Sequence, residues 1–162
     1  MFFETAAWEK LKQACEKGYP KEVCGLLFGK EGGHTVKKIE VLTNILDGRY
    51  NNRLDELFSI GAVTLPTERL GRGGALEFMI DPGEHQKKLA LAQIFDRLDQ
   101  IGLFHSHPDH PAKPSATDAS QPMLAGWSNI IVAVNKGEVV DIRSWFREDE
   151  SSPFQEERIL VE

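Results

Sequence analysis

The chain has 162 residues, of which 41% are hydrophobic and 27% are charged, as is typical of a globular domain. Its net charge of -6 argues against a protein that binds nucleic acid nonspecifically, because such binding needs a basic surface. No apolar run approaches the roughly 18 residues that span a bilayer. Residues 1–5 lack the basic and apolar regions of a signal peptide, and two cysteines are too few for a disulfide framework. These features predict a single domain over residues 1–162, located in the cytoplasm.

The first quarter of the chain predicts a helix followed by a strand hairpin. Thr5 is suited to cap a helix over residues 6–17. The apolar stretch 23–29 predicts a strand, and Glu31-Gly32-Gly33 predicts a turn into a second strand over 34–42. The apolar residues of this second strand do not alternate cleanly, which indicates a bulge.

Residues 44–76 are the least regular part of the sequence. They are rich in glycine and asparagine, and only a short helix over 54–60 is expected among them. Such a long irregular segment is uncommon in a compact domain and is usually functional or disordered. We interpret it as a flexible insertion within the single domain.

The next segment predicts a short strand over 78–80 and then a helix that runs to about Asp99. Asp81 is suited to cap this helix, Pro82 fits its first position, and Glu84 completes a start that resembles a capping box. The apolar residues at helical spacing are Leu91, Phe95 and Leu98.

The second half of the chain alternates strands and one short helix. Strands are predicted over 101–104, 128–135 and 139–147, a helix over 116–124, and an edge strand over 154–162. The whole order predicts a mixed α/β (α+β) fold, with a mainly antiparallel sheet flanked by helices.

Two histidines follow the strand at 101–104. His105 and His107 are two residues apart, so on a continued strand both side chains face the same way. One buried histidine is commonly a hydrogen-bonded core residue, whereas two on one face each need their own partners. Asp118 lies beyond a loop with three prolines and completes a set of two histidines and one carboxylate. This set is typical of a catalytic zinc with a fourth position for water.

Purely structural interpretations of the other polar residues stay open. Ser115 and Asp118 have the spacing of a capping box, in which each would satisfy backbone groups of the following helix. A carboxylate that binds a metal has less capacity left for such a cap, so the two roles compete. Glu22 lies at the start of the first strand and, considered alone, would be a solvated charge beside Lys21.

Taken together, these residues resemble the JAMM (MPN+) metalloprotease family. The segment from His105-Ser106-His107 through Ser115 to Asp118 matches its pattern of His-x-His, seven residues, serine, two residues and aspartate. Glu22 corresponds to the glutamate that the family carries far upstream. The resemblance covers nearly the whole chain and implies the three-layer MPN fold, which is cytidine-deaminase-like.

The resemblance also implies a role for each residue of the site. Zn²⁺ would be bound by His105, His107 and Asp118 and would lower the pKa of its bound water towards 7. Glu22 would act as general base and then as general acid, and Ser115 would donate a hydrogen bond to the oxyanion. His110 has no ligand role in the pattern, and Ser106 is expected to face away from the histidines, as a supporting or structural residue.

The implied reaction is hydrolysis of a peptide or isopeptide bond. The compact length is similar to small prokaryotic members that act at the C-terminus of ubiquitin-like sulfur-carrier proteins. Two alternatives stay open: a deconjugating isopeptidase that removes ubiquitin-like proteins from lysines, and a non-catalytic MPN scaffold without metal. Residues 44–76 are then either a substrate flap or a surface loop, and the oligomeric state is not predicted.

Overall fold

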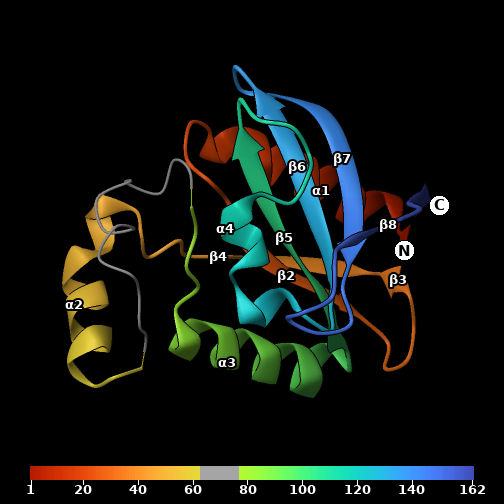
Figure 1. The fold of residues 1–162 in the computed structure, drawn as a ribbon. Coiled ribbons are helices and arrows are strands. Elements are labelled where there is room, and N and C mark those ends of the chain that lie inside the picture. Colours follow the sequence, from red (N-terminus) through yellow and green to blue (C-terminus); the bar gives the residue numbers. More distant parts are fainter. Residues whose placement is uncertain (63–76) are drawn as a thin grey trace.

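The computed structural model describes residues 1–62 and 77–162 and is organised around a six-stranded sheet (Figure 1). Four of its five strand pairs are antiparallel, and only the β5–β6 pair is parallel. The prediction of a mainly antiparallel sheet is therefore confirmed. In spatial order the strands are β4 (Lys38–Leu42), β2 (Cys24–Gly29), β5 (Asp99–Pro108), β6 (Ser128–Asn135), β7 (Glu138–Phe146) and β8 (Gln155–Glu157).

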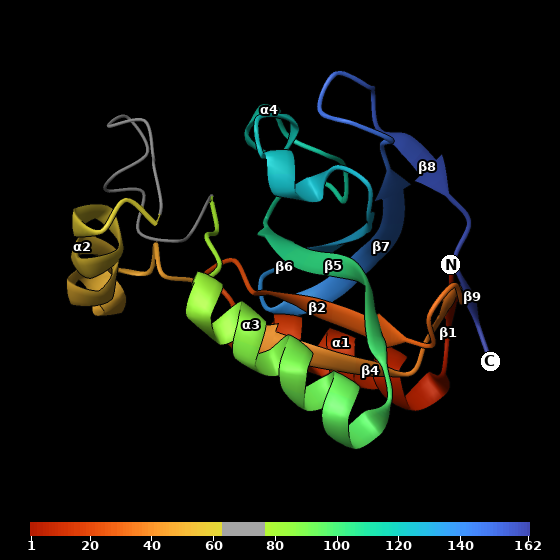
Figure 2. The ribbon, with the colours of Figure 1, turned by 90° about the horizontal axis from the view of Figure 1, so that it is seen from below.

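Helices cover both faces of this sheet and give three layers (Figure 2). Helix α1 (Thr5–Gly18) covers one face, and α3 (Pro82–Leu91) and α4 (Ala116–Ala119) lie over the other. Alternate strand residues divide the core accordingly, because side chains along a strand point to opposite faces. Leu27 of β2 packs on the α1 side, whereas Leu26 packs on the side of α3.

A second, small sheet joins the two ends of the chain. Its parallel strands are β3 (Thr35–Val36), β1 (Phe2–Phe3) and β9 (Leu160–Val161), in that order. The single strand predicted over 34–42 is therefore wrong in one respect: it divides at Lys37, and its two halves join different sheets. The predicted C-terminal edge strand likewise forms as two short strands, β8 and β9.

The cap predicted for the first helix is also wrong. Glu4 occupies the capping position without a side-chain hydrogen bond, and Thr5 is the first helical residue. The Thr5 hydroxyl instead donates to the backbone oxygen of Glu162, at 2.7 Å. A long-range contact with the C-terminus has taken the place of the local cap.

The insertion contains more helix than the sequence predicts. A 3₁₀ turn, η1 (Gly48–Tyr50), leads into α2 (Asn51–Ser59), which begins three residues before the predicted helix. Residues 63–76, the C-terminal part of the predicted flap, lie outside the described residues. The flexible insertion and the single domain over 1–162 therefore stay predictions.

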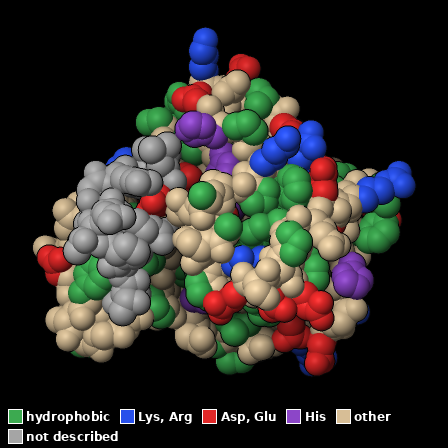
Figure 3. Space-filling view, in the orientation of Figure 1, with side chains coloured by type: hydrophobic (Ala, Val, Ile, Leu, Met, Phe, Trp, Pro, Cys, Tyr) green, Lys and Arg blue, Asp and Glu red, His purple; other side chains and the backbone are tan. Residues whose placement is uncertain are grey.

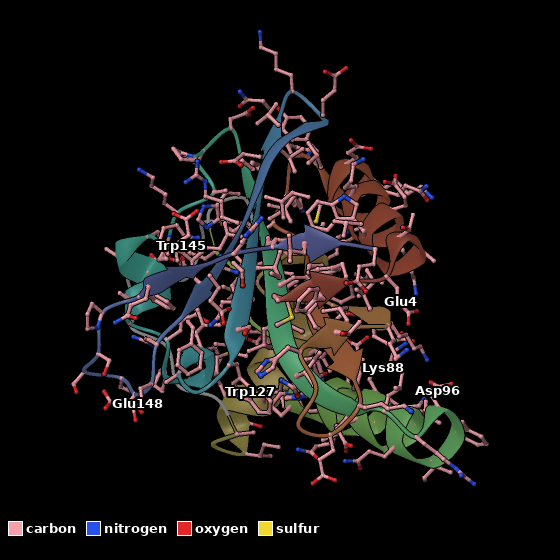
Figure 4. The ribbon with its side chains drawn as sticks, turned by 90° about the vertical axis from the view of Figure 1, so that its right-hand side faces the viewer. Glu4, Lys88, Asp96, Trp127, Trp145 and Glu148 are labelled. Carbon is pink, nitrogen blue, oxygen red and sulfur yellow. The ribbon has the colours of Figure 1, made fainter. Side chains whose placement is uncertain are left out.

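Helix α3 begins as predicted but packs differently. The Asp81 carboxylate caps it by accepting from the backbone N–H of Gly83, at 2.8 Å. Glu84 does not complete a capping box, because its carboxylate accepts from the backbone N–H of Thr43. Ion pairs from Lys88 to Glu40 (2.8 Å) and from Asp96 to Lys38 (2.6 Å) attach the helix to β4 (Figure 4).

The end of this helix differs from the regular pattern that its spacing predicts. It continues as a turn of π-helix, η3 (Ala92–Asp96), which ends three residues before Asp99. A π turn shifts the rotational register of side chains. Leu91 and Phe95 are consequently 40% and 76% exposed, and only Leu98 of the predicted set is buried.

Two short predicted elements are also corrected. Residues 78–80 form no strand; Ile80 makes an isolated bridge with Asn44. The helix predicted over 116–124 is the single turn α4, followed by a separate 3₁₀ turn, η4 (Pro122–Leu124). Pro122 cannot donate the backbone hydrogen bond that a continuous helix would need. Among the described helices, none combines the length and apolar character needed to cross a membrane.

Candidate metal centre

Strand β5 places two histidines side by side. His105 and His107 continue the line of Leu103, which faces the α3 and α4 side of the sheet. Sheet pairing with β2 and β6 fixes the backbone on both sides of His105. The two histidines are only 1% and 6% exposed, so the fold has buried both imidazoles.

Asp118, from α4, meets the two imidazoles. His105 Nε2 lies 3.1 Å from Asp118 Oδ1, His107 Nε2 lies 3.3 Å from Oδ2, and the two Nε2 atoms are 3.0 Å apart. Ligands about 2.0–2.1 Å from a tetrahedral zinc lie roughly 3.3–3.4 Å from one another. The two Nε2 atoms already lie near this separation, and one ligand atom from each of the three residues lies within 4.8 Å of the others, so these residues fit the metal.

Neighbouring groups orient the histidines for this role. His107 Nδ1 lies 2.8 Å from the backbone oxygen of Pro111, which favours a proton on Nδ1 and a lone pair on Nε2. The His105 ring stacks on Phe78, with centroids 4.7 Å apart. Each ring thus has a contact that fixes its plane while Nε2 faces Asp118.

The alternative capping role of Asp118 is realised together with this geometry. Its Oδ2 accepts from the backbone N–H and the hydroxyl of Ser115, both at 2.7 Å, and its own N–H donates to Ser115 Oγ. Burial opposes the charge on Asp118, but the two histidines and the Ser115 N–H keep the pKa of this carboxyl well below its usual range. Burial likewise opposes the charge on His107, yet the hydrogen bond and charge of Asp118 raise the pKa of this histidine.

Glu22 and His107 line a hollow that we call the metal cavity. Its volume is about 310 Å³, and its walls include Glu22, His107, His110, Lys113, Ser115 and Thr117. Glu22 is 7% exposed, and its charge contributes to the raised pKa of His107. On the face seen in Figure 3, histidine side chains reach the surface near both acidic and basic side chains.

Asn44 fixes the segment that carries Glu22. Its amide nitrogen donates to the backbone oxygens of Glu22 (3.2 Å) and Glu77 (3.0 Å). Its amide oxygen accepts from the backbone N–H groups of Leu46 and Met79. All four hydrogen-bonding positions of this buried amide are used, so one side chain connects Glu22 to the start of the insertion and to the segment that follows it.

Ser106 connects the same segment to the histidine strand. The backbone N–H of Val23 donates to Ser106 Oγ, and the backbone N–H of Ser106 donates to the Val23 oxygen, both at 2.8 Å. The hydroxyl thus faces away from the imidazoles, as the strand alternation predicts. It sets the position of the residue next to Glu22.

Side chains of β7 and of the residue that follows this strand fix the segments around Asp118. Arg147 is buried and donates to the backbone oxygens of Ala119 (2.8 Å) and Gln121 (2.5 Å). Trp145 donates from Nε1 to the backbone oxygen of Ala112, at 3.0 Å, on the side of the sheet where α4 lies (Figure 4).

Three of the five predicted site residues, Glu22, His107 and Ser115, line the metal cavity, and the other two, His105 and Asp118, contact His107. His110 is exposed in the cavity wall, and Ser106 lies behind the histidines. Sequence reasoning missed Asn44 and Arg147. Neither carries a local signal, because the partners of each come from distant segments of the chain.

Comparisons with known proteins show the family of the chain. Residues 4–148 match the family of prokaryotic homologs of the JAB domain. The chain is 31% identical over 142 residues to the desampylase of Pyrococcus furiosus, covering 87% of this chain and 76% of that protein.

Solved structures share the fold. A Salinibacter ruber protein has a TM-score of 0.65 at 28% identity, covering 100% of this chain and 92% of its own. A JAB1/MPN domain protein from Archaeoglobus fulgidus has a TM-score of 0.54 at 16% identity, covering 99% of this chain and 98% of its own. The predicted MPN fold is confirmed, and the chain belongs to the prokaryotic JAB-domain branch of the JAMM/MPN family.

Proposed function

We propose that this protein is a zinc-dependent hydrolase that cuts a peptide or isopeptide bond at the C-terminus of a ubiquitin-like sulfur-carrier protein. One observation carries the proposal: ligand atoms of three buried residues lie within 4.8 Å of one another beside a cavity that Glu22 lines. His105, His107 and Asp118 would bind the ion. When bound, zinc supplies Lewis-acid chemistry, lowering the pKa of water and polarising the scissile carbonyl.

Glu22 is the proton carrier of the proposed reaction. Its carboxylate takes the proton of the attacking water and delivers it to the leaving nitrogen, as general base and then general acid. The contacts of Asn44 and Ser106 keep the Glu22 backbone in place during both transfers.

Ser115 supplies the hydrogen bond to the oxyanion. Its hydroxyl has one proton, which it donates to Asp118 in the structure, so the hydroxyl must turn towards the substrate. The backbone N–H of Ser115 still donates to Asp118 after that rotation, so the carboxylate keeps its orientation.

The choice of a ubiquitin-like substrate rests on the relatives. The relative from Pyrococcus furiosus is named a desampylase, which supports an enzyme that removes a ubiquitin-like protein from conjugates. A deconjugating isopeptidase that releases such proteins from lysines is the alternative within the same chemistry. A metal-free scaffold is disfavoured, because nothing is missing from the donor set.

Cleavage of two matched substrates tests this function. The zinc-loaded protein is incubated with a carrier bearing a linear extension after Gly-Gly and with the same carrier joined to a lysine side chain. We expect the wild-type protein to cut the linear substrate after Gly-Gly. Glu22→Gln should lose this activity, and Glu9→Gln, at an exposed position of α1, should keep it. Faster cleavage of the lysine conjugate would select the deconjugase, and two intact substrates would contradict the proposal.

A further inference from the structure

We infer that Lys113 is a binding residue for a carboxylate on the leaving side of the scissile bond. The inference rests on the proposed function and narrows its substrate to a carrier whose leaving residue keeps a free C-terminal carboxylate. Lys113 stands in the wall of the metal cavity together with Glu22, His107 and Ser115. A ligand in this cavity therefore meets a cationic side chain and the reacting groups at once.

Lys113 differs from the other cations near Glu22. Glu22 also lines a second hollow of about 300 Å³, which we call the Asp47 cleft. There Lys21 and Arg49 both pair with the buried Asp47, at 2.7 and 2.8 Å. Within residues 1–62 and 77–162, in contrast, the ammonium of Lys113 has no ion pair or hydrogen bond. Of these two hollows, the metal cavity is thus the one that retains an unneutralised cation.

The loop that carries Lys113 is fixed in place. Ala112 is buried, and its backbone oxygen accepts from Trp145. Asp109, at the start of the loop, accepts from the Tyr19 hydroxyl (2.8 Å) and from the backbone N–H of Lys136 (3.0 Å). A binding group on a rigid segment loses less entropy when the ligand arrives. The backbone of Lys113 is therefore already positioned at the cavity.

The chemistry of the leaving group explains the need for this cation. Hydrolysis adds one water across the C–N bond, so the carrier gains a carboxylate and the leaving residue gains an amine. If the leaving group is one amino acid, its own carboxylate lies close to the scissile nitrogen and shares the cavity with the Glu22 carboxylate. Lys113 compensates this repulsion. A lysine within a target protein brings no such carboxylate, so the cation would contribute nothing to its binding.

Two substrates that differ only at the terminal group test the inference. A carrier is prepared with one residue after Gly-Gly, as the free acid and as the amide. The wild-type protein should prefer the acid about five- to tenfold in kcat/KM, the effect of one charge-assisted hydrogen bond. In Lys113→Met the two substrates should react equally, through loss on the acid alone, and Lys113→Arg should restore the preference. Lys87→Met, on exposed α3, is the matched control.

A binding measurement separates this inference from the proposed function. In the Glu22→Gln background, fluorescence anisotropy gives the Kd of both carriers without turnover. Tighter binding of the acid that disappears in Lys113→Met supports the inference, even if neither substrate is cut and the proposed function fails. Equal affinities for acid and amide, or a preference that survives Lys113→Met, would overturn it.

Discussion

The site is built from two kinds of segment, and they are held in different ways. The strand β5 that carries His105 and His107 is paired on both sides, by β2 and by β6. The segments that carry Glu22 and Asp118 have no such continuous pairing there. They depend on single side chains, chiefly Asn44 and Arg147.

This difference separates metal binding from proton transfer. Two of the three metal-binding residues belong to a strand that backbone hydrogen bonds hold on both sides. Glu22, in contrast, depends on a few hydrogen bonds that one substitution can remove while the sheet stays folded. Substitutions that remove these side-chain contacts should therefore reduce the rate of catalysis more than they reduce the zinc content.

The largest effect is expected where the metal itself loses a ligand. Asp118→Asn should lower zinc affinity by at least about a hundredfold, since even the loss of a group that orients a ligand costs 10- to 100-fold. An amide oxygen can still accept from Ser115, so α4 should keep its cap. Competition with a chelator measures the affinity, with Asp55→Asn on exposed α2 as control. Unchanged affinity would remove Asp118 from the donor set.

Asn44→Asp tests the contact on the Glu22 side. The new carboxylate would face the two carbonyl oxygens of Glu22 and Glu77, which should destabilise the fold by about 2 kcal/mol. A shift of the Glu22 segment should slow cleavage by about ten- to a hundredfold, with zinc retained. Rates and zinc content are measured below the unfolding temperature, with Asn52→Asp at an exposed position as the matched control. A folded variant with the wild-type rate would show that Asn44 does not position Glu22.

The acidity of the donors predicts a pH dependence of zinc binding. In the metal-free protein burial opposes the charge on His107, but the hydrogen bond and charge of Asp118 leave its pKa raised, so the imidazole keeps its proton to a higher pH. That proton must leave before Nε2 binds a metal. Zinc affinity should therefore fall as pH decreases, by about tenfold per pH unit below this pKa. Calorimetry in buffers of different ionisation enthalpy counts the protons released when zinc binds. A count of zero would contradict the exchange of the His107 proton for zinc.

Ser106→Ala should have the smallest effect. It removes one acceptor for the Val23 N–H, at a cost of about 1 kcal/mol in unfolding free energy. Cleavage should slow by roughly three- to tenfold through the neighbouring Glu22. Ser144→Ala is the matched control, because it removes a buried hydroxyl that bonds Glu157, at the β7–β8 pair. If both variants slow cleavage equally, Ser106 acts only through stability.

Much of the sheet could be predicted because its signals are local. Continuous apolar runs indicate β2 and β6, and the spacing of His105 and His107 places both on one face of β5. The predicted capping box at Ser115 also formed. In these cases the neighbours along the chain decide the structure.

The errors arise where distant residues compete with local preferences. The Thr5 hydroxyl donates to the backbone oxygen of Glu162, and the Glu84 carboxylate accepts from the backbone N–H of Thr43. Neither side chain therefore forms its predicted cap. The π turn of η3 exposes Phe95, because regular helical spacing no longer applies there. The role of Asn44 could not be predicted, because its hydrogen-bond partners lie up to 35 residues away along the chain.

Zinc content per chain tests the central claim most directly. Elemental analysis of the purified protein should give about one zinc per chain. His107→Ala should remove it, and Glu22→Gln should retain it, because Glu22 is proposed as the proton carrier and not as a ligand. A wild-type protein without zinc after incubation with the metal, or a His107→Ala variant that keeps it, would contradict the account.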